Sequence, residues 1–426
     1  MTVDVLSPPA PAERQARTAV AVLFFTNGAL FANLLPRFPQ IKADLGIGNA
    51  AYGLAVAAFP TGAIVAGLAA GALIRRYGSG RVAVGGTVLT GIGVLAAGLS
   101  GSVVLFATAL LLAGAMDAIT DVAQNAHGLR VQRRYGRSII NSFHAIWSIG
   151  AVTGGSMAAG AIALDLSLGQ HLLISAVVFG IAACVALRFC LTGPDTEPDA
   201  EAAKEETNGE AKEETNERAA REAGAESREL APQREEKLRK TRLRTGYVLA
   251  ALVLIAASGA LVEDAGSSWA ALYLSDSLHA SGTLAASGYI ALVGAQFVGR
   301  MIGDRLVDRF GQRTVARSGG LIAAVGMGLA LAVPTATGTI LGFATAGFGV
   351  ATLVPAAMHE ADELPGLKPG SGLTIVSWLM RLGFLLSPPI VGLVADSTSL
   401  RVGLLVVPLA GLMVMVLAGV LQPRRR

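Results

Sequence analysis

The chain has 426 residues, of which 53% are hydrophobic and only 15% are charged. Because about a quarter of the residues of a soluble protein are charged, this composition excludes an ordinary soluble globular protein. The formal net charge of +4 does not indicate nucleic-acid binding, since the basic residues lie in short loops between hydrophobic runs. We therefore expect a lipid bilayer as the surroundings of the chain and no nucleic-acid partner.

Six hydrophobic runs fill the first part of the chain. Each is long enough to cross the hydrocarbon core of a bilayer, which needs about 20 apolar residues. The stretch 1–17 is polar and leads into the first run without a small-residue cleavage pattern, so we expect this run to be retained. The predicted helices are 18–36, 50–74, 82–100, 103–126, 138–162 and 169–191.

A charged segment, 193–244, follows these runs and holds half of the acidic residues of the chain. It has almost no large apolar side chain, so it cannot bury enough surface to offset its ordering entropy. We predict a flexible or partly helical linker, whose basic end contacts anionic lipid headgroups. Six more hydrophobic runs follow it, and the predicted helices are 246–274, 282–305, 313–334, 337–358, 370–395 and 401–421.

A short motif occurs once on each side of the linker. Residues 71–78 read GALIRRYG and residues 304–311 read DRLVDRFG, an offset of 233 residues (304 minus 71). A repeat of this size indicates a duplicated helical bundle. We therefore predict an all-α membrane protein with twelve transmembrane helices in two pseudo-symmetric six-helix bundles, and its parts are a tail 1–17, a bundle 18–192, the linker 193–244, a bundle 245–421 and a tail 422–426.

The basic residues lie in alternate loops. Clusters follow the second, fourth and eighth predicted helices, whereas the loops 101–102 and 335–338 have no basic residue. Lys and Arg in short loops stay on the cytoplasmic side of a membrane. We therefore expect both termini and the linker to be cytoplasmic.

These features resemble the major facilitator superfamily over nearly the whole chain. The superfamily has twelve helices in two halves and a loop pattern, roughly G-x-x-x-D-R-x-G-R-R, after helices 2 and 8. The second copy keeps the family's acid at Asp308, whereas the first copy has Arg75 in that place. The resemblance implies a cytoplasmic gating role for the motif residues Gly71, Arg75, Arg76, Gly78, Asp304, Asp308, Arg309, Gly311 and Arg313.

Within the superfamily, three segments are similar to a branch of poorly characterised bacterial inner-membrane permeases near the fucose permease group. They are residues 114–126, 137–144 and 263–274. The resemblance implies a multi-pass protein of the bacterial cytoplasmic (plasma) membrane that works by alternating access, as a monomer. It also implies that helices 1, 4, 7 and 10 line a cavity between the halves.

Polar groups on the fourth and fifth predicted helices are candidates for proton or substrate binding. Asp117, Asp121 and Asn125 follow one another at four-residue spacing and share a helix face. His144 lies about as deep in the next helix as Asp121 lies in its own, so the two side chains are expected to meet. A carboxylate in hydrocarbon persists only when it is paired, hydrated or protonated. A purely structural contact between these helices, or between Asp121 and Arg137, is the alternative.

The seventh predicted helix carries two adjacent acids near its middle, Glu263 and Asp264. Adjacent helix positions point about 100° apart, so only one of them faces a cavity squarely. Arg381, near the middle of the eleventh helix, is the predicted counter-ion of Glu263, and Arg300 is a second candidate. A pair that opens on protonation would couple protons to transport; the alternative is a permanent structural salt bridge.

Neutral polar and aromatic side chains inside the predicted helices are candidates for contacts with a solute. Buried amides need hydrogen-bond partners, which a solute or water supplies in a cavity. Tryptophans away from the membrane interface either stack on a flat ligand or pack in the core. The candidates for the substrate cavity are Asn27, Asn33, Trp147, Gln296 and Trp378.

The leading hypothesis is a secondary active transporter of a small organic solute, coupled to protons, with sodium as the other candidate ion. No G-x-x-x-x-G-K-[ST] loop exists to bind ATP. An efflux antiporter for a drug or metabolite and a non-transporting receptor that uses the linker are the alternatives. No metal-ligand or nucleophile–base spacing stands out, so we expect no cofactor, no metal site and no enzymatic activity.

Overall fold

The structure, a computed structural model, describes residues 10–136, 139–193, 227–364, 367 and 371–422. All regular elements of these residues are helical, and twelve stretches among them are long and apolar enough to cross a membrane. The prediction of an all-α membrane protein with twelve spans is confirmed. Arg137, the tails 1–9 and 423–426 and the linker residues 194–226 lie outside the described residues.

The first bundle has six spans, some of which are built from more than one helix. Proline has no amide hydrogen to donate and interrupts helices; Pro36 lies in the 3-10 turn η1, and Pro60 lies just after the break between α3 and α4. The elements of this bundle are α1 (Pro11–Ala32), η1 (Leu35–Arg37), α2 (Phe38–Leu45), α3 (Asn49–Val56), α4 (Ala58–Gly67), α5 (Ala70–Tyr77), α6 (Ser79–Gly98), α7 (Val103–Tyr135), α8 (Ile140–Ala163) and α9 (Leu168–Leu187).

The second bundle repeats this arrangement, and its first helix extends back into the predicted linker. That helix begins at Ser227, so the last part of the linker, 227–244, is helical. The elements are α11 (Ser227–Leu272), the π turn η2 (Tyr273–Ser277), α12 (Gly282–Phe310), α13 (Gln312–Ala332), α14 (Ala336–Val350), α15 (Leu353–Asp362), α16 (Ser371–Leu379), α17 (Arg381–Ser397), α18 (Leu400–Gly403), α19 (Val406–Leu417) and η3 (Ala418–Val420).

Several helices are longer than the hydrophobic runs that predicted them. The run 103–126 belongs to α7, which continues to Tyr135, and the run 282–305 belongs to α12, which continues to Phe310. Both extensions contain Arg, which favours helix once the chain has left the hydrocarbon. Hydrophobicity thus marks the edge of the membrane, whereas a glycine with positive φ marks the end of each helix, at Gly136 and Gly311.

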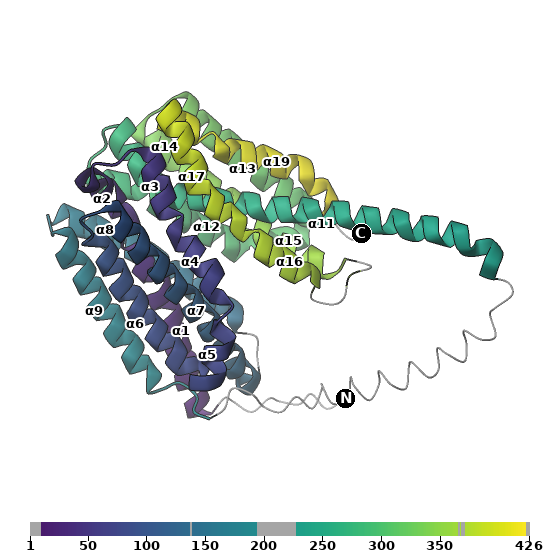
Figure 1. Ribbon diagram of the computed structural model, residues 1–426, viewed down its shortest axis with the longest axis horizontal. Helices are drawn as coiled ribbons and strands as arrows, with labels where there is room; N and C mark the ends of the chain where they lie inside the picture. The colour runs from purple at the N-terminus through teal and green to yellow at the C-terminus, as the bar shows by residue number, and fades with distance from the viewer. Residues whose placement is uncertain (1–9, 137–138, 194–226, 365–366, 368–370, 423–426) are drawn as a thin grey trace.

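The two bundles contact each other mainly through α8 against α12 and α3 against α17 (Figure 1). The second of these contacts is unusually close. A Cβ atom at Gly53 would overlap the carbonyl oxygen of Pro388, and one at Gly392 would overlap the carbonyl oxygen of Asn49. Glycine at both positions therefore allows the backbones of α3 and α17 to touch, as small residues do at helix interfaces in membranes.

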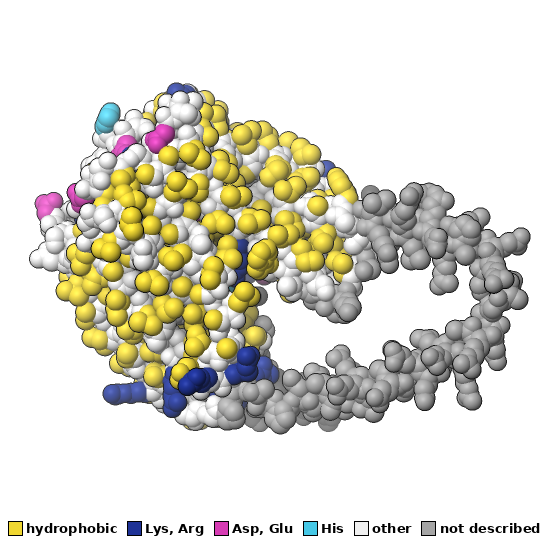
Figure 2. Space-filling view, in the orientation of Figure 1, with side chains coloured by type: hydrophobic (Ala, Val, Ile, Leu, Met, Phe, Trp, Pro, Cys, Tyr) yellow, Lys and Arg dark blue, Asp and Glu magenta, His cyan; other side chains and the backbone are white. Residues whose placement is uncertain are grey.

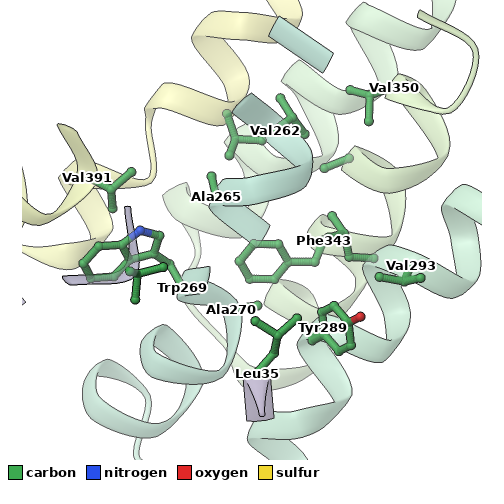
Figure 3. Close-up of a cluster of buried hydrophobic side chains, with 14 of the residues drawn as sticks. Leu35, Val262, Ala265, Trp269, Ala270, Tyr289, Val293, Phe343, Val350 and Val391 are labelled. Carbon is green, nitrogen blue, oxygen red and sulfur yellow. The ribbon is translucent and has the colours of Figure 1, made fainter. Parts of the chain in front are cut away.

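A hydrophobic cluster joins the bundles at the same end of the molecule. It contains Trp269 of α11 and Val391 of α17 from the second bundle, and Leu35 of η1 and Tyr52 of α3 from the first. Figure 3 shows Trp269 near Val391 and Leu35 near Tyr289. The Tyr52 ring meets the Trp269 ring edge-on, with 4.9 Å between centroids. We call this end of the molecule, which includes the loops around residues 46–48, 164–167, 278–281 and 398–399, the closed end.

The two copies of the sequence motif form the same turn. Gly78 ends α5 and begins α6 with φ 84° and ψ 146°, and Gly311 ends α12 and begins α13 with φ 82° and ψ 152°. Such backbone angles are accessible almost only to glycine. We call the end of the molecule with these turns and the exposed Arg75, Arg76 and Arg309 the basic end.

We predict that Gly311→Ala lowers the free energy of unfolding by about 1–3 kcal/mol, because alanine is strained at this φ. The matched control is Gly328→Ala, since Gly328 lies inside α13 and a Cβ atom there would meet nothing within 4 Å. The control is expected to be neutral or slightly stabilising. Denaturant unfolding of the purified protein measures both, and equal effects of the two substitutions would contradict the strain argument.

Candidate functional site

A hydrogen-bond network around Asn27 joins three helices of the first bundle. The Asn27 side chain on α1 donates from Nδ2 to Asp117 Oδ1 of α7 at 2.7 Å, and its Oδ1 accepts from Trp147 Nε1 of α8 at 2.9 Å. Gln124 Nε2 of α7 is also 3.4 Å from Asn27 Oδ1. Three predicted residues, Asn27, Asp117 and Trp147, are thus brought together, with the Asn27 amide at the centre.

Asp121 lies one turn further along α7 and is held by neighbours on its own helix. Its Oδ1 accepts from Asn125 Nδ2 at 3.0 Å and from Gln124 Nε2 at 3.3 Å. His144 of α8 is close enough to Asp121 to interact electrostatically, but within the described residues the two side chains form no ion pair. The His144 ring is exposed and meets the Phe24 ring edge-on at 5.3 Å.

Glu263 of α11 bonds to two residues of α12. Its Oε2 accepts from Gln296 Nε2 at 2.6 Å and lies 3.6 Å from Arg300 Nη2. The expectation that Arg381 is the counter-ion of Glu263 is therefore wrong for this conformation, and Arg300 has that place. The physical reason is the direction of the two side chains. Glu263 points toward α12, whereas Arg381, at the start of α17, is directed toward Asp121 of the first bundle.

Arg381 faces the other bundle. Its positive charge acts on the Asp121 carboxylate of α7, and that of Arg300 acts on His144 of α8. Both interactions cross between bundles without a direct contact within 4.0 Å among the described residues. One carboxylate of the first bundle, Asp121, thus faces a guanidinium group of the second bundle, Arg381.

Asp264 points to a different place from its neighbour Glu263. It faces Ser387 of α17, and its Oδ1 lies 3.5 Å from the Ser268 hydroxyl. Its Oδ2 is buried and has no hydrogen-bond partner among the described residues. Only Glu263 of this adjacent pair contacts α12, as the helix geometry requires.

Asn33 and Trp378 lie apart from these groups. Asn33 is fully buried between α1 and α9, where its Oδ1 accepts from the Ser175 hydroxyl at 3.0 Å and lies 2.8 Å from His171 Nε2. This places Asn33 inside the first bundle. Trp378 of α16 is 53% exposed, so it is not held in a packed core.

The motif residues at the basic end are largely exposed. Arg76 stacks over the Tyr77 ring and Arg309 over the Phe310 ring, both at 5.3 Å, so the repeat extends to side-chain contacts. Asp304 and Asp308 are exposed, and within the described residues neither is in an ion pair. Arg313 has another position, since its Nε donates to the Leu421 carbonyl at 3.0 Å and thus holds the end of the last span.

Polar contacts between the bundles lie at the closed end. Asp396 Oδ1 accepts from the Asn49 amide and its Oδ2 from the Ala50 amide, both at 2.9 Å, so this carboxylate of α17 caps α3. Lys42 Nζ lies 3.0 Å from Asp276 Oδ2, and the Tyr52 hydroxyl donates to the Ser268 carbonyl at 2.8 Å.

Among the described residues, no hydrogen bond or ion pair joins the bundles at the basic end. Figure 2 shows the bundles in contact at the end with acidic side chains and separated by a notch toward the other end. The polar groups between the bundles are therefore reached from the basic end. A site that is closed on one side and open on the other has the geometry of one state of an alternating-access cycle.

Sequence reasoning missed the partners of three candidates. Gln124 is fully buried and joins Asn27 to Asp121, while His171 and Ser175 hold Asn33. The spacing of Gln124, seven residues after Asp117 and three after Asp121, was the available signal, because these intervals place it on the same helix face. His171 and Ser175 gave a weaker signal, a four-residue polar spacing in an otherwise apolar run.

Comparisons with known proteins agree with this architecture. A model of the Major Facilitator Superfamily matches residues 20–364 and 267–426. The uncharacterized transporter y4wD of Sinorhizobium fredii (strain NBRC 101917 / NGR234) is 28% identical over 403 residues, which cover 95% of this chain and 97% of that protein.

Two solved structures show the same fold. A mutant of the nucleoside transporter NupG has a TM-score of 0.71 at 11% identity, with 96% of this chain and 100% of that chain covered. The D-xylose-proton symporter has a TM-score of 0.67 at 16% identity, with 95% and 96% covered.

We predict that Asp396→Asn raises the population of molecules with a separated closed end by about threefold to fivefold. The substitution removes the negative charge and one of the two acceptors that cap α3, and a helix cap contributes about 1 kcal/mol. Spin labels at the exposed positions 44 and 283, one in each bundle, allow the separation to be measured by double electron–electron resonance.

The matched control is Asp165→Asn, an exposed acid of the closed end whose side chain caps nothing among the described residues. It is expected to leave the distance distribution unchanged. If both substitutions shift the distribution equally, the effect comes from net charge at this end and the capping argument is wrong.

Proposed function

Because the chain belongs to the major facilitator superfamily, we propose that it is a secondary active transporter that moves a small organic solute by alternating access, coupled to protons. The observation that carries the proposal is the Asn27–Asp117–Trp147 network, which places a carboxylate among amide and indole donors between two bundles that open at one end. Such groups bind hydroxyl and amine groups of a polar solute.

The proposed orientation follows from charge. Exposed arginines gather at the basic end, and basic loops stay in the cytoplasm. We therefore place the basic end, both termini and the linker in the cytoplasm of a bacterial cell, with the protein in its cytoplasmic membrane. In this orientation the structure is the inward-open state, and the bundles are the two rocking units of a monomer.

The proposed coupling uses the charges that face each other across the bundles. When Asp121 is ionised it attracts Arg381, which favours approach of the bundles at the basic end. Protonation of Asp121 removes this attraction. Protonation of Asp117 removes the negative charge to which the Asn27 amide donates its hydrogen bond. Glu263, with Gln296 and Arg300, forms the corresponding polar centre of the second bundle.

The substrate class is inferred from the same groups. The residues proposed to contact the solute are Asn27, Trp147 and Gln296, with Trp378 at the basic side. They offer amide and indole groups, which suit a sugar-like or nucleoside-like solute. The names of two structural neighbours, a nucleoside transporter and a D-xylose-proton symporter, support this class and proton coupling. No catalytic step or cofactor is part of the proposal.

We predict that Asp117→Asn abolishes uphill uptake of the solute but leaves exchange of solute across the membrane measurable. Asparagine keeps the size of the side chain and a partner for Asn27 but cannot carry a proton. A thermal-shift screen of monosaccharides and nucleosides across pH selects the solute. Radiolabelled uptake and counterflow in proteoliposomes then separate the two activities.

Glu263→Gln tests the second bundle in the same assays, and Asp165→Asn is the control that should retain both activities. If Asp117→Asn and Glu263→Gln both leave concentrative uptake and its pH dependence unchanged, the coupling scheme is wrong. Uptake that follows an imposed sodium gradient and ignores a proton gradient would identify sodium as the coupling ion instead. Solute-driven proton movement in the opposite direction would identify an efflux antiporter.

Deletion of residues 200–226 tests the receptor alternative. The deletion removes most of the linker and leaves α11 from Ser227 onward intact. We predict that uptake by this variant stays within about twofold of the full chain, because the entropy of closing a loop changes only slowly with its length. Loss of transport in the variant, with normal folding by thermal shift, would show that the linker has more than a tethering role.

A further inference from the structure

We propose that the outer surface of the first bundle binds an anionic phospholipid, with an acyl chain in the groove between α6 and α9 and the phosphate at Arg81 and Arg188. The groove has a volume of ≈ 370 Å³ and opens to the outside of the bundle. Its walls are almost entirely apolar and include Val88, Ala176, Gly180, Ile181 and Cys184, with Arg188 at one end.

The groove lies between two places where α6 packs closely against α9 or the residues just after it. At the basic end, a Cβ atom at Gly80 would lie 3.3 Å from the Cys190 Cβ atom. Near the closed end the helices are in tight contact, since a Cβ atom at Gly98 would overlap the Leu172 side chain. At Gly180 the nearest atom to an added Cβ would be a Val88 methyl at 3.9 Å. The resulting space runs along the helices and lies open to the membrane, as an acyl chain requires.

The corresponding helices of the second bundle, α13 and α19, are in close contact at one pair of glycines. A Cβ atom at Gly320 of α13 would lie 2.6 Å from the carbonyl oxygen of Gly411 of α19, so the two backbones touch. This contact is closer than the one between Gly180 and Val88, which borders the groove of the first bundle.

Two arginines lie at the mouth of the groove. Contacts of Gly91 with Ala176 and of Gly80 with Cys190 fix the antiparallel register of α6 and α9. This register places Arg81 level with Arg188. Both side chains are exposed, and within the described residues neither is in an ion pair. Basic pockets between helices at a membrane surface bind anionic lipid headgroups.

The backbone at the mouth also suits a phosphate. The first turn of α6 begins at Ser79 and points its amide groups toward this end, which favours an anion. The opposing carbonyls of residues 191 and 192, just after α9, accept hydrogen bonds from Arg130. An inorganic phosphate would use only the mouth, whereas a phospholipid uses the mouth and the apolar groove together.

The test is cross-linking with phosphatidylglycerol that carries a diazirine in one acyl chain, in lipid nanodiscs of phosphatidylcholine. Mass spectrometry identifies the labelled peptides. We expect labelling of residues 82–94 and 176–188 that exceeds labelling by the matched phosphatidylcholine probe. The variant Arg81→Gln/Arg188→Gln should lose about fivefold per arginine, as expected for loss of a surface charge. The control Arg75→Gln/Arg133→Gln removes equal charge at the basic end and should have no effect.

A second variant tests the groove independently of charge. Gly180→Leu fills it and should reduce labelling of these peptides by both probes, whereas Gly328→Leu, at a lipid-facing glycine of the second bundle, should not. Equal labelling by the two probes, or equal labelling of α13 and α19, would overturn the proposal. Displacement of the probe by inorganic phosphate as effectively as by phosphatidylglycerol would also overturn it, because the ligand would then be free phosphate.

Discussion

The structure depends on one constraint, that polar groups inside a bilayer must bond to one another because no water is present to bond them. Asn27 satisfies the Asp117 carboxylate and the Trp147 indole at once, and Glu263 is satisfied by Gln296 and Arg300. Each of these networks ties helices of one bundle together. The polar groups proposed to act in transport therefore also fix the relative rotation of the helices that carry them.

The two bundles repeat one backbone plan with different charges. The turns at Gly78 and Gly311 are alike, and so are the anchors of the last spans. His127 Nε2 accepts from the Leu191 amide, and Glu360 Oε2, 233 residues later (360 minus 127), accepts from the Gln422 amide. The interiors differ, since the second bundle pairs the carboxylate of Glu263 with its own Arg300, whereas Asp121 of the first bundle faces Arg381 of the other bundle. The two bundles thus share a backbone plan but place their charges differently.

The sequence predicted the spans and the repeat, because hydrophobicity and glycine spacing act locally. It did not predict which polar groups meet. Depth along a helix follows from 1.5 Å per residue, and on that basis Arg381 and Arg300 were both at the level of Glu263. The choice between them depends on how the helices rotate and pack, which the sequence of one hydrophobic run does not determine. For the same reason the sequence did not reveal the partners of Asn33 on α9, since only the structure shows that α1 and α9 are adjacent.

The contacts that join the bundles at the closed end must have a modest total free energy, because they have to separate in the proposed transport cycle. The ion pair at this end joins Lys42 to Asp276, whose side chain is 40% exposed, and partly exposed pairs of this kind contribute about 0–1 kcal/mol. The buried Tyr52–Trp269 contact and the touching backbones at Gly53 contribute packing that is lost on opening. A proton or solute shifts this balance only by the difference in its affinity for the two states. Asp121 of the first bundle and Arg381 of the second carry opposite charges and face each other away from the closed end, so we infer that this pair sets the difference at the basic end.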